Sequence, residues 1–129
     1  MMRSNTKQET IVFERDKCEL LTLVLKKKWF DMIASGEKTA EYRTSKNVCA
    51  QIERWYGRAR IKCSYEKGKA SIDKHLIVKF CLGYGKDRPT FMRNVLGVEK
   101  RCWSLCPDWG EPREPHMVIN LGDPVEFAS

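Results

Sequence analysis

The chain has 129 residues and carries 24 lysines and arginines against 17 aspartates and glutamates, giving a formal net charge of +7. This length predicts a single domain, and the hydrophobic fraction of 42% is typical of globular rather than disordered proteins. No run approaches the roughly 18 apolar residues of a membrane span, and no apolar signal-peptide core is visible. These features predict a cytoplasmic protein with no membrane partner, and the basic surplus favours RNA or a nucleotide as the partner.

The six cysteines are predicted to be free thiols, because no secretory signal is expected. Three of them, Cys18, Cys49 and Cys81, have the surroundings of small core residues. Cys102 and Cys106, with His116 downstream, could form a metal cluster. Their spacing matches none of the tight zinc signatures, so neither a metal nor another cofactor is expected.

The first half of the chain alternates between predicted strands and helices, after an N-terminal arm. Residues 1–17 are polar and predict a loosely ordered arm, while residues 18–129 predict the folded domain. Aliphatic runs indicate strands, apolar residues at spacings of three and four indicate helices, and a glycine suits each helix end. The predicted elements are a strand at 18–25, a helix at 27–35 ended by Gly36, a strand at 38–43 and a helix at 45–56 ended by Gly57.

The second half reads as strands separated by turns, with a possible bulge at Gly97. The predicted strands lie at 58–63, 75–82, 91–99 and 116–121, with loops at 66–74, 83–85 and 102–115 and a turn at 122–124. Two helices are too few for the crossovers of a doubly wound sheet. The order therefore predicts an α+β fold, a small mixed β-barrel of about five to seven strands with two short helices.

Three ionisable side chains follow the first predicted helix closely. Along a strand alternate residues share a face, so Glu41 and Arg43 are expected to point the same way. Lys38 lies at the turn before the strand, where its long side chain can reach them. Such a cluster can hold a phosphate or polarise a carbonyl, or lower the pKa of Lys38 so that it acts as a base or nucleophile. A surface ion-pair triad without a function is the alternative.

Residues 36–43 (GEKTAEYR) match the G-x-K-x-x-E-x-R signature of ASCH domains, and the chain resembles small prokaryotic and phage members of that family. The preceding strand and helix, with their aromatic pair, are also similar to the family. So are the strand ending at residues 83–84 and the segment 107–112 (PDWGEP) that leads into the strand at 116–122. The similarity covers most of the chain.

The resemblance implies a PUA-like barrel with a cleft between helix and sheet, lined by the motif and suited to RNA or a nucleobase. Some relatives remove the acetyl group from N4-acetylcytidine, and RNA cleavage is another activity reported in the family. The amidohydrolases use a Lys, a Thr and a distant Glu. Lys38 matches the lysine, Glu41 stands in place of the threonine, and Glu99 and Glu111 are candidates for the distant glutamate.

Three functional hypotheses follow: a hydrolase acting on an acylated nucleobase through Lys38, a non-catalytic RNA-binding module, and a small ribonuclease. An aromatic side chain on a bare loop can stack on a base, although it can equally anchor the loop. His75 and His116 are expected to be structural, because no serine or cysteine is placed to form a triad with them. The candidate catalytic residues are Lys38, Glu41 and Glu111, and the candidate substrate-binding residues are Arg43, Gly36, Tyr84 and Trp109.

Overall fold

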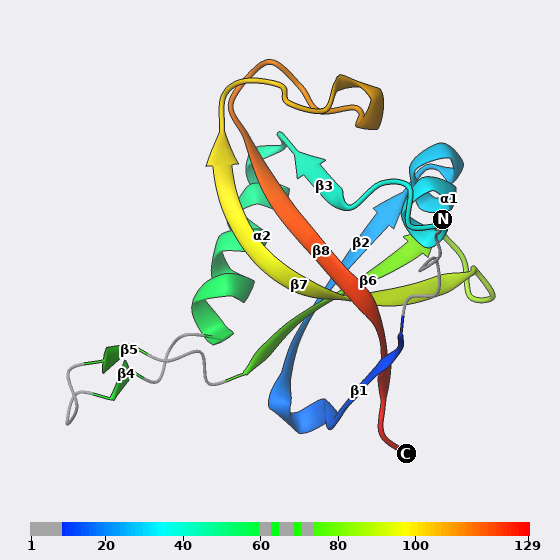
Figure 1. Cartoon of the computed structure of the whole chain (residues 1–129), viewed down its shortest axis with the longest axis vertical. Helices are drawn as coiled ribbons and strands as arrows, with labels where there is room; N and C mark the ends of the chain where they lie inside the picture. Colours follow the sequence, from blue (N-terminus) through cyan, green and yellow to red (C-terminus); the bar gives the residue numbers. More distant parts are fainter. Residues whose placement is uncertain (1–8, 60–62, 65–68, 71–73) are drawn as a thin grey trace, which may run out of the picture.

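The computed structural model describes residues 9–59, 63–64, 69–70 and 74–129, and Figure 1 shows its long curved strands with two helices packed beside them. The helices are α1 (Lys27–Ala34) and α2 (Lys46–Ala59). The strands of the main sheet are β1 (Ile11–Phe13), β2 (Cys18–Leu25), β3 (Ala40–Arg43), β6 (His75–Leu82), β7 (Thr90–Arg101) and β8 (His116–Phe127). A separate two-stranded sheet joins β4 (Cys63–Ser64) and β5 (Lys69–Ala70), and one-turn 3-10 helices lie at Arg15–Lys17 and Pro107–Trp109.

The main sheet is mixed and has six strands, which confirms the predicted α+β class with two helices. Its order is β1-β8-β7-β6-β2, with β3 also paired to β8. The β2–β6 and β1–β8 pairs are parallel, whereas β3–β8, β6–β7 and β7–β8 are antiparallel. The arm predicted for residues 1–17 therefore contributes a strand at Ile11–Phe13, and residues 1–8 lie outside the described part.

The sheet is not a closed barrel, so the prediction of closure was wrong. Both short strands, β1 and β3, pair with β8, and the opposite edge of the sheet is β2. A side chain, and not a backbone ladder, spans the opening at β3: the guanidinium Nη2 of Arg43 donates to the carbonyl oxygen of Val24 in β2 at 2.9 Å. The candidate site therefore lies at the seam between the two free edges.

Local signals placed most elements correctly, and tertiary packing moved some of their ends. The predicted strands at 18–25 and 75–82 and the first helix are confirmed. The second helix does not end at Gly57, because Trp55 and Ala59 are both fully buried and the core holds another half-turn. Residues 58–59 of the predicted strand at 58–63 belong to α2, residues 60–62 are not described, and most of the loop predicted at 66–74 is not described either.

The predicted turn at residues 122–124 was wrong, since β8 continues to Phe127. Pro124 pairs with Arg93 across a stretch where the β7–β8 register shifts, and the second of these shifts lies between Val95 and Gly97. This confirms the bulge predicted near Gly97. A proline, which lacks an N–H donor, is accommodated where the hydrogen-bond ladder is already irregular.

The core lies between the inner face of the sheet and the two helices. Its largest fully buried side chain is Trp55, whose indole Nε1 donates to the backbone oxygen of Glu19 at 2.8 Å. Cys18 and Cys81 are buried, Cys49 is half-buried, and the cysteines with described side chains are free thiols, as predicted. Within the described ranges, no helix combines the length and apolarity that a membrane crossing needs.

A buried arginine fixes the end of α1, the helix that leads into the candidate site. Arg93 Nη2 donates to the carbonyl oxygens of Ile33 and Ala34 at 2.9 and 3.2 Å. These are carbonyls of the last helical turn, which have no partner within the helix. We expect Arg93→Met to lower the free energy of unfolding by about 2–4 kcal/mol, because buried carbonyls lose a charged donor. Chemical denaturation measures this, and Arg54→Met, at an exposed arginine, should stay within about 0.5 kcal/mol of the wild type.

Candidate functional site

The turn after α1 delivers Lys38 to the site. Gly36 has a φ of 86°, the left-handed conformation predicted for it, and its N–H donates to the carbonyl of Ile33 at 3.0 Å. The N–H of Lys38 then donates to the carbonyl of Met32 at 2.9 Å, so the chain folds back over the last turn of the helix. Gly36 thus shapes the backbone of the motif.

Lys38, Glu41 and Arg43 form one ion-pair cluster. Lys38 Nζ lies 3.0 Å from Glu41 Oε1, and Arg43 Nε lies 2.8 Å from Glu41 Oε2. Glu41 and Arg43 pair with Ile119 and Met117 of β8, so both project from the same face of β3, as the alternation predicted. The structure therefore brings together the carboxylate and the two cations.

The cluster is buried, unlike a surface ion-pair triad. The side chain of Lys38 is 2% exposed and that of Arg43 is 21% exposed. Burial lowers the pKa of Lys38 below the ordinary value of 10.5, the nearby Glu41 carboxylate raises it in part, and the charge of Arg43 lowers it further. A larger fraction of neutral amine is therefore available near neutral pH than for a surface lysine.

Two aromatic rings enclose the ammonium group of Lys38. Its Nζ lies 4.4 Å from the centroid of the Trp29 ring and 5.3 Å from that of Tyr42. Neither Trp29 nor Tyr42 is among the site residues predicted from the sequence. The position of Tyr42 inside the motif, between Glu41 and Arg43, is the one local signal that could have suggested it. Cation–π contacts of this kind hold a desolvated ammonium group in place.

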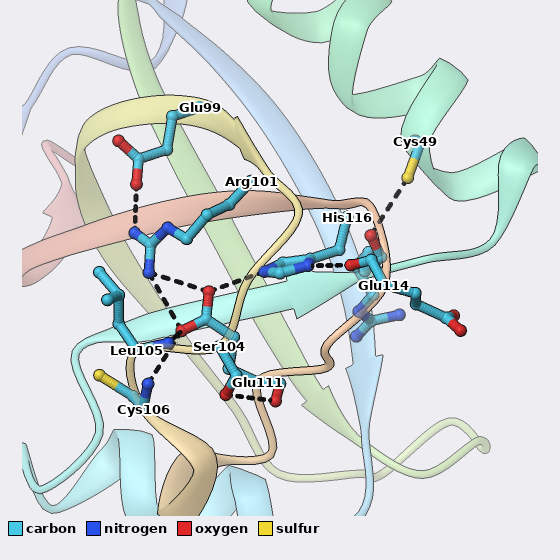
Figure 2. Close-up of polar contacts among 10 residues, drawn as sticks. Cys49, Glu99, Arg101, Ser104, Leu105, Cys106, Glu111, Glu114 and His116 are labelled. Carbon is cyan, nitrogen blue, oxygen red and sulfur yellow. Dashed lines mark hydrogen bonds and ion pairs between the residues drawn. The ribbon is translucent and has the colours of Figure 1, made fainter.

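A second buried cluster centres on Glu111 in the connection between β7 and β8 (Figure 2). Its carboxylate accepts hydrogen bonds from Arg101 Nη1 at 2.9 and 3.0 Å and from the backbone N–H groups of Leu105 and Cys106 at 2.8 and 3.0 Å. Arg101 also pairs with Glu99, which is half-exposed. Both candidates for the distant glutamate are thus bound to the same arginine.

His116 completes this second cluster. Its Nε2 lies 2.7 Å from Glu111 Oε2 and its Nδ1 lies 2.6 Å from the carbonyl oxygen of Glu114. A carbonyl oxygen only accepts hydrogen bonds, so Nδ1 donates in that contact. Burial by itself would raise the pKa of Glu111, but the hydrogen bonds from His116 and from the two backbone amides, together with Arg101, hold it below the ordinary value of 4.5.

The lowered pKa of Glu111 makes the fold sensitive to acid. A carboxyl group with a lower pKa in the folded state stabilises the protein above its unfolded pKa, and this contribution is lost as the pH falls through the folded value. We therefore expect the free energy of unfolding to drop from about pH 5 downwards, and to drop less steeply in Glu111→Gln. Thermal unfolding monitored between pH 7 and 3 tests this. Glu37→Gln, at an exposed carboxylate, should keep the wild-type slope, and equal slopes for all three proteins would contradict it.

Tyr42 lies between the two clusters. Its ring packs edge-on against His116, with a centroid distance of 5.8 Å, and it also faces Lys38. Burial raises the pKa of Tyr42 and the neighbouring Cys106 thiol adds to this, so its hydroxyl stays protonated at physiological pH. A substitution at Glu111 can therefore alter the surroundings of Lys38 through the packed rings of His116 and Tyr42.

The β7–β8 connection closes over Trp29 at Gly110. Gly110 has a φ of 81°, and a Cβ built on it would lie 2.8 Å from the Trp29 ring. We expect Gly110→Ala to weaken this contact and to lower the free energy of unfolding by about 1–3 kcal/mol, through both strain and the clash. Gly83→Ala is the matched control, because Gly83 has a similar φ of 65° with nothing within 4 Å of the added Cβ. Equal losses in denaturation experiments would show that the Trp29 contact contributes nothing.

The two predicted stacking residues are placed differently from the buried cluster. Tyr84 is 87% exposed in the turn between β6 and β7, and Trp109 is half-buried in the short 3-10 helix of the β7–β8 connection. Within the described part of the chain, the rings that lie over the Lys38 ammonium are those of Trp29 and Tyr42, and not those of Tyr84 or Trp109. The structure therefore unites three of the predicted site residues and leaves Tyr84 and Trp109 at other positions on the surface.

The cavities on the described part of the chain include four of about 260 to 460 Å³, and Lys38, Glu41 and Arg43 line none of these four. The rings of Trp29 and Tyr42 and the buried position of Lys38 account for this. The cavity of about 350 Å³ adjoins Arg43, because its lining includes Cys49, whose thiol donates to the backbone oxygen of Arg43, and Met117, the β8 partner of Arg43.

A scan against protein-family models found no match, and searches of curated proteins and of solved structures found none either. The likeness to ASCH domains rests on the motif and its flanking segments.

Proposed function

We propose that this chain is an ASCH-like protein with a PUA-like fold that binds RNA or a modified nucleoside and hydrolyses the amide of an acylated nucleobase such as N4-acetylcytidine. The observation that carries the proposal is a buried, carboxylate-bound lysine: Lys38 Nζ lies 3.0 Å from Glu41 Oε1, and burial lowers its pKa. Lysines tuned in this way serve as proton-transfer groups.

In the proposed reaction the neutral amine of Lys38 takes a proton from a water molecule while the water oxygen bonds to the acyl carbon. The carbonyl π electrons move to its oxygen, and the guanidinium of Arg43 stabilises that negative charge. Lys38 then returns the proton to the amide nitrogen as the carbon–nitrogen bond breaks, which releases the nucleobase amine and the carboxylic acid. Glu41 holds the Lys38 side chain in position throughout. These steps use only side chains of the chain.

The reaction needs a state in which the substrate replaces some of the groups that cover Lys38. The Trp29 ring lies against both Lys38 and the Gly110 segment. The ring of an incoming base can take the place of the Trp29 ring or stack on it, since both are flat and apolar. Movement of the Gly110 segment is then part of substrate entry.

The test incubates the protein with N4-acetylcytidine and measures cytidine by chromatography. We expect release by the wild type, a loss of at least about 100-fold in Lys38→Ala, and no change in Lys27→Ala, at an exposed lysine paired with Asp31. The rate of the wild type should rise with pH through an inflection below 10.5, because the neutral amine is the active form. Turnover that survives Lys38→Ala, or its absence in the wild type, would overturn the proposed hydrolysis.

A binding module without catalysis is the second candidate. It is favoured because the charged groups of the cluster already form ion pairs with one another. Lys38 and Glu41 satisfy one another, and the more exposed Arg43 has two of its five N–H donors engaged with Glu41 and Val24. Arg43 would then bind a phosphate or carbonyl of an RNA that the protein leaves unchanged. RNA affinity that falls steeply with salt and is lost in Arg43→Ala, without any turnover, would favour this candidate.

A further inference from the structure

We infer that the groove beside α2 binds a second base of a single-stranded RNA, next to the nucleotide at the Lys38 cluster. The α2 groove is defined here as the cavity of about 350 Å³ lined by Cys49, Glu53, Lys100, Trp103, His116 and Met117, among others. A neighbouring cavity of about 280 Å³ shares Glu53, Lys100 and Met117 with it and extends it along the helix. Each volume lies near the lower end of the range for small-ligand pockets.

The chemistry of the α2 groove suits a nucleotide. Trp103 is 55% exposed although it is a large aromatic residue, and an accessible indole ring is a platform on which any base can stack. Lys100 stands next to it, with its ammonium 3.0 Å from Glu53. This exposed ion pair contributes little to stability, so a phosphate can take the place of the carboxylate at small cost.

The α2 groove lies beside Arg43, a member of the proposed site. The thiol of Cys49 donates to the backbone oxygen of Arg43 at 3.2 Å, and Met117 is the β8 partner of Arg43. Two groove residues therefore touch or flank Arg43, on which the proposed function places one nucleotide. The next nucleotide of the same strand falls in the groove.

A protein partner fits this surface less well. A standard protein–protein contact buries about 1,600 Å² of surface. The α2 groove instead has the volume of a small ligand, and its lining includes the charged Lys100 and the aromatic Trp103. The net charge of +7 also favours an anionic polymer. The inference names single-stranded RNA as the substrate class, and it rests on the proposed function for the position of the first nucleotide.

Fluorescence anisotropy with a 5′-labelled octamer of riboadenosine tests the inference on the full chain. We expect Trp103→Ala to weaken binding about tenfold or more, because a stacking platform is removed, and Trp103→Phe to retain most of the affinity. Leu105→Ala is the matched control, since Leu105 is 62% exposed on the same connection and does not line the groove. Lys100→Ala should weaken binding and reduce the slope of log affinity against log salt by about 0.7.

Three results would overturn the inference. Equal affinities of Trp103→Ala, Leu105→Ala and the wild type would exclude the α2 groove as an RNA site. If the wild-type protein releases cytidine from N4-acetylcytidine but does not bind the octamer, the inference is overturned and the proposed function stands. If it does neither, both the inference and the proposed function are overturned. Concentration-dependent self-association that Trp103→Ala abolishes, with unchanged RNA affinity, would identify the groove as a contact between protein copies instead.

Discussion

Replacement of Glu41 by leucine is expected to lower the free energy of unfolding by about 3–5 kcal/mol, since it strands a buried ammonium group. Lys38 Nζ is bonded to Glu41 at 3.0 Å and is covered by aromatic rings, so water cannot take over the role of the carboxylate. Lys38→Met should cost less, because Glu41 keeps its second cation, Arg43, at 2.8 Å. The buried cluster thus has an asymmetric response to the loss of either partner.

A double-mutant cycle measures this asymmetry. The pair Lys38→Met and Glu41→Leu together should be more stable than Glu41→Leu alone, because no buried charge is left uncompensated within the pair. Urea denaturation with two probes gives the four free energies. Additive losses would show that Lys38 and Glu41 do not interact in solution as they do in the structure. Equal losses for the two single variants would contradict the asymmetry.

Replacement of Glu111 by alanine is the second change with a large expected effect, again about 3–5 kcal/mol. One carboxylate accepts hydrogen bonds from Arg101, His116 and the backbone amides of Leu105 and Cys106. Without it, Arg101, His116 and two backbone amides lose their buried partner, and Arg101 keeps its contact with Glu99. Each buried donor that loses its partner costs about 1–3 kcal/mol.

Glu111→Ala should destabilise the β7–β8 connection locally, as well as lower the free energy of unfolding of the whole protein, since Glu111 holds that connection in place. We expect hydrogen exchange of the Leu105 and Cys106 amides to accelerate first in Glu111→Ala, and the contact of Gly110 with Trp29 to loosen. Glu114→Ala is the control, because the contact made by Glu114 in this cluster uses its backbone oxygen, which the substitution keeps. Unchanged exchange at Leu105 and Cys106 would show that other contacts hold the connection.

The amino-acid sequence alone determined the elements whose signals are local. The aliphatic runs of β2 and β6, the amphipathic spacing of α1 and the left-handed Gly36 all depend on neighbouring residues, and all are confirmed. The proximity of Lys38, Glu41 and Arg43 could likewise be predicted from local sequence signals. These residues lie within six positions. The period of a strand fixes the common face of Glu41 and Arg43, and Lys38 reaches them from the turn before the strand.

Only the tertiary structure decided whether that cluster is a surface feature or a buried site. Its cover depends on a distant part of the chain: the Trp29 ring lies over Lys38, and Gly110, which follows after most of the strands, lies against that ring. Contacts of this kind depend on which strands pair, and no local pattern encodes the pairing of β3 with β8. The same holds for Glu111, whose partners become visible only when β7 and β8 lie side by side.

The open sheet shows most directly why the sequence could not predict the closure of the barrel. Strand patterns predict how many strands form and which faces are apolar, but closure depends on whether the last edges meet. Here the short strands β1 and β3 both pair with β8, and the opening next to β2 is spanned by the guanidinium of Arg43 bonded to the carbonyl of Val24. The sequence thus determined the chemical groups of the candidate site, and the long-range pairing of the strands decided that they would lie buried at the seam of the sheet.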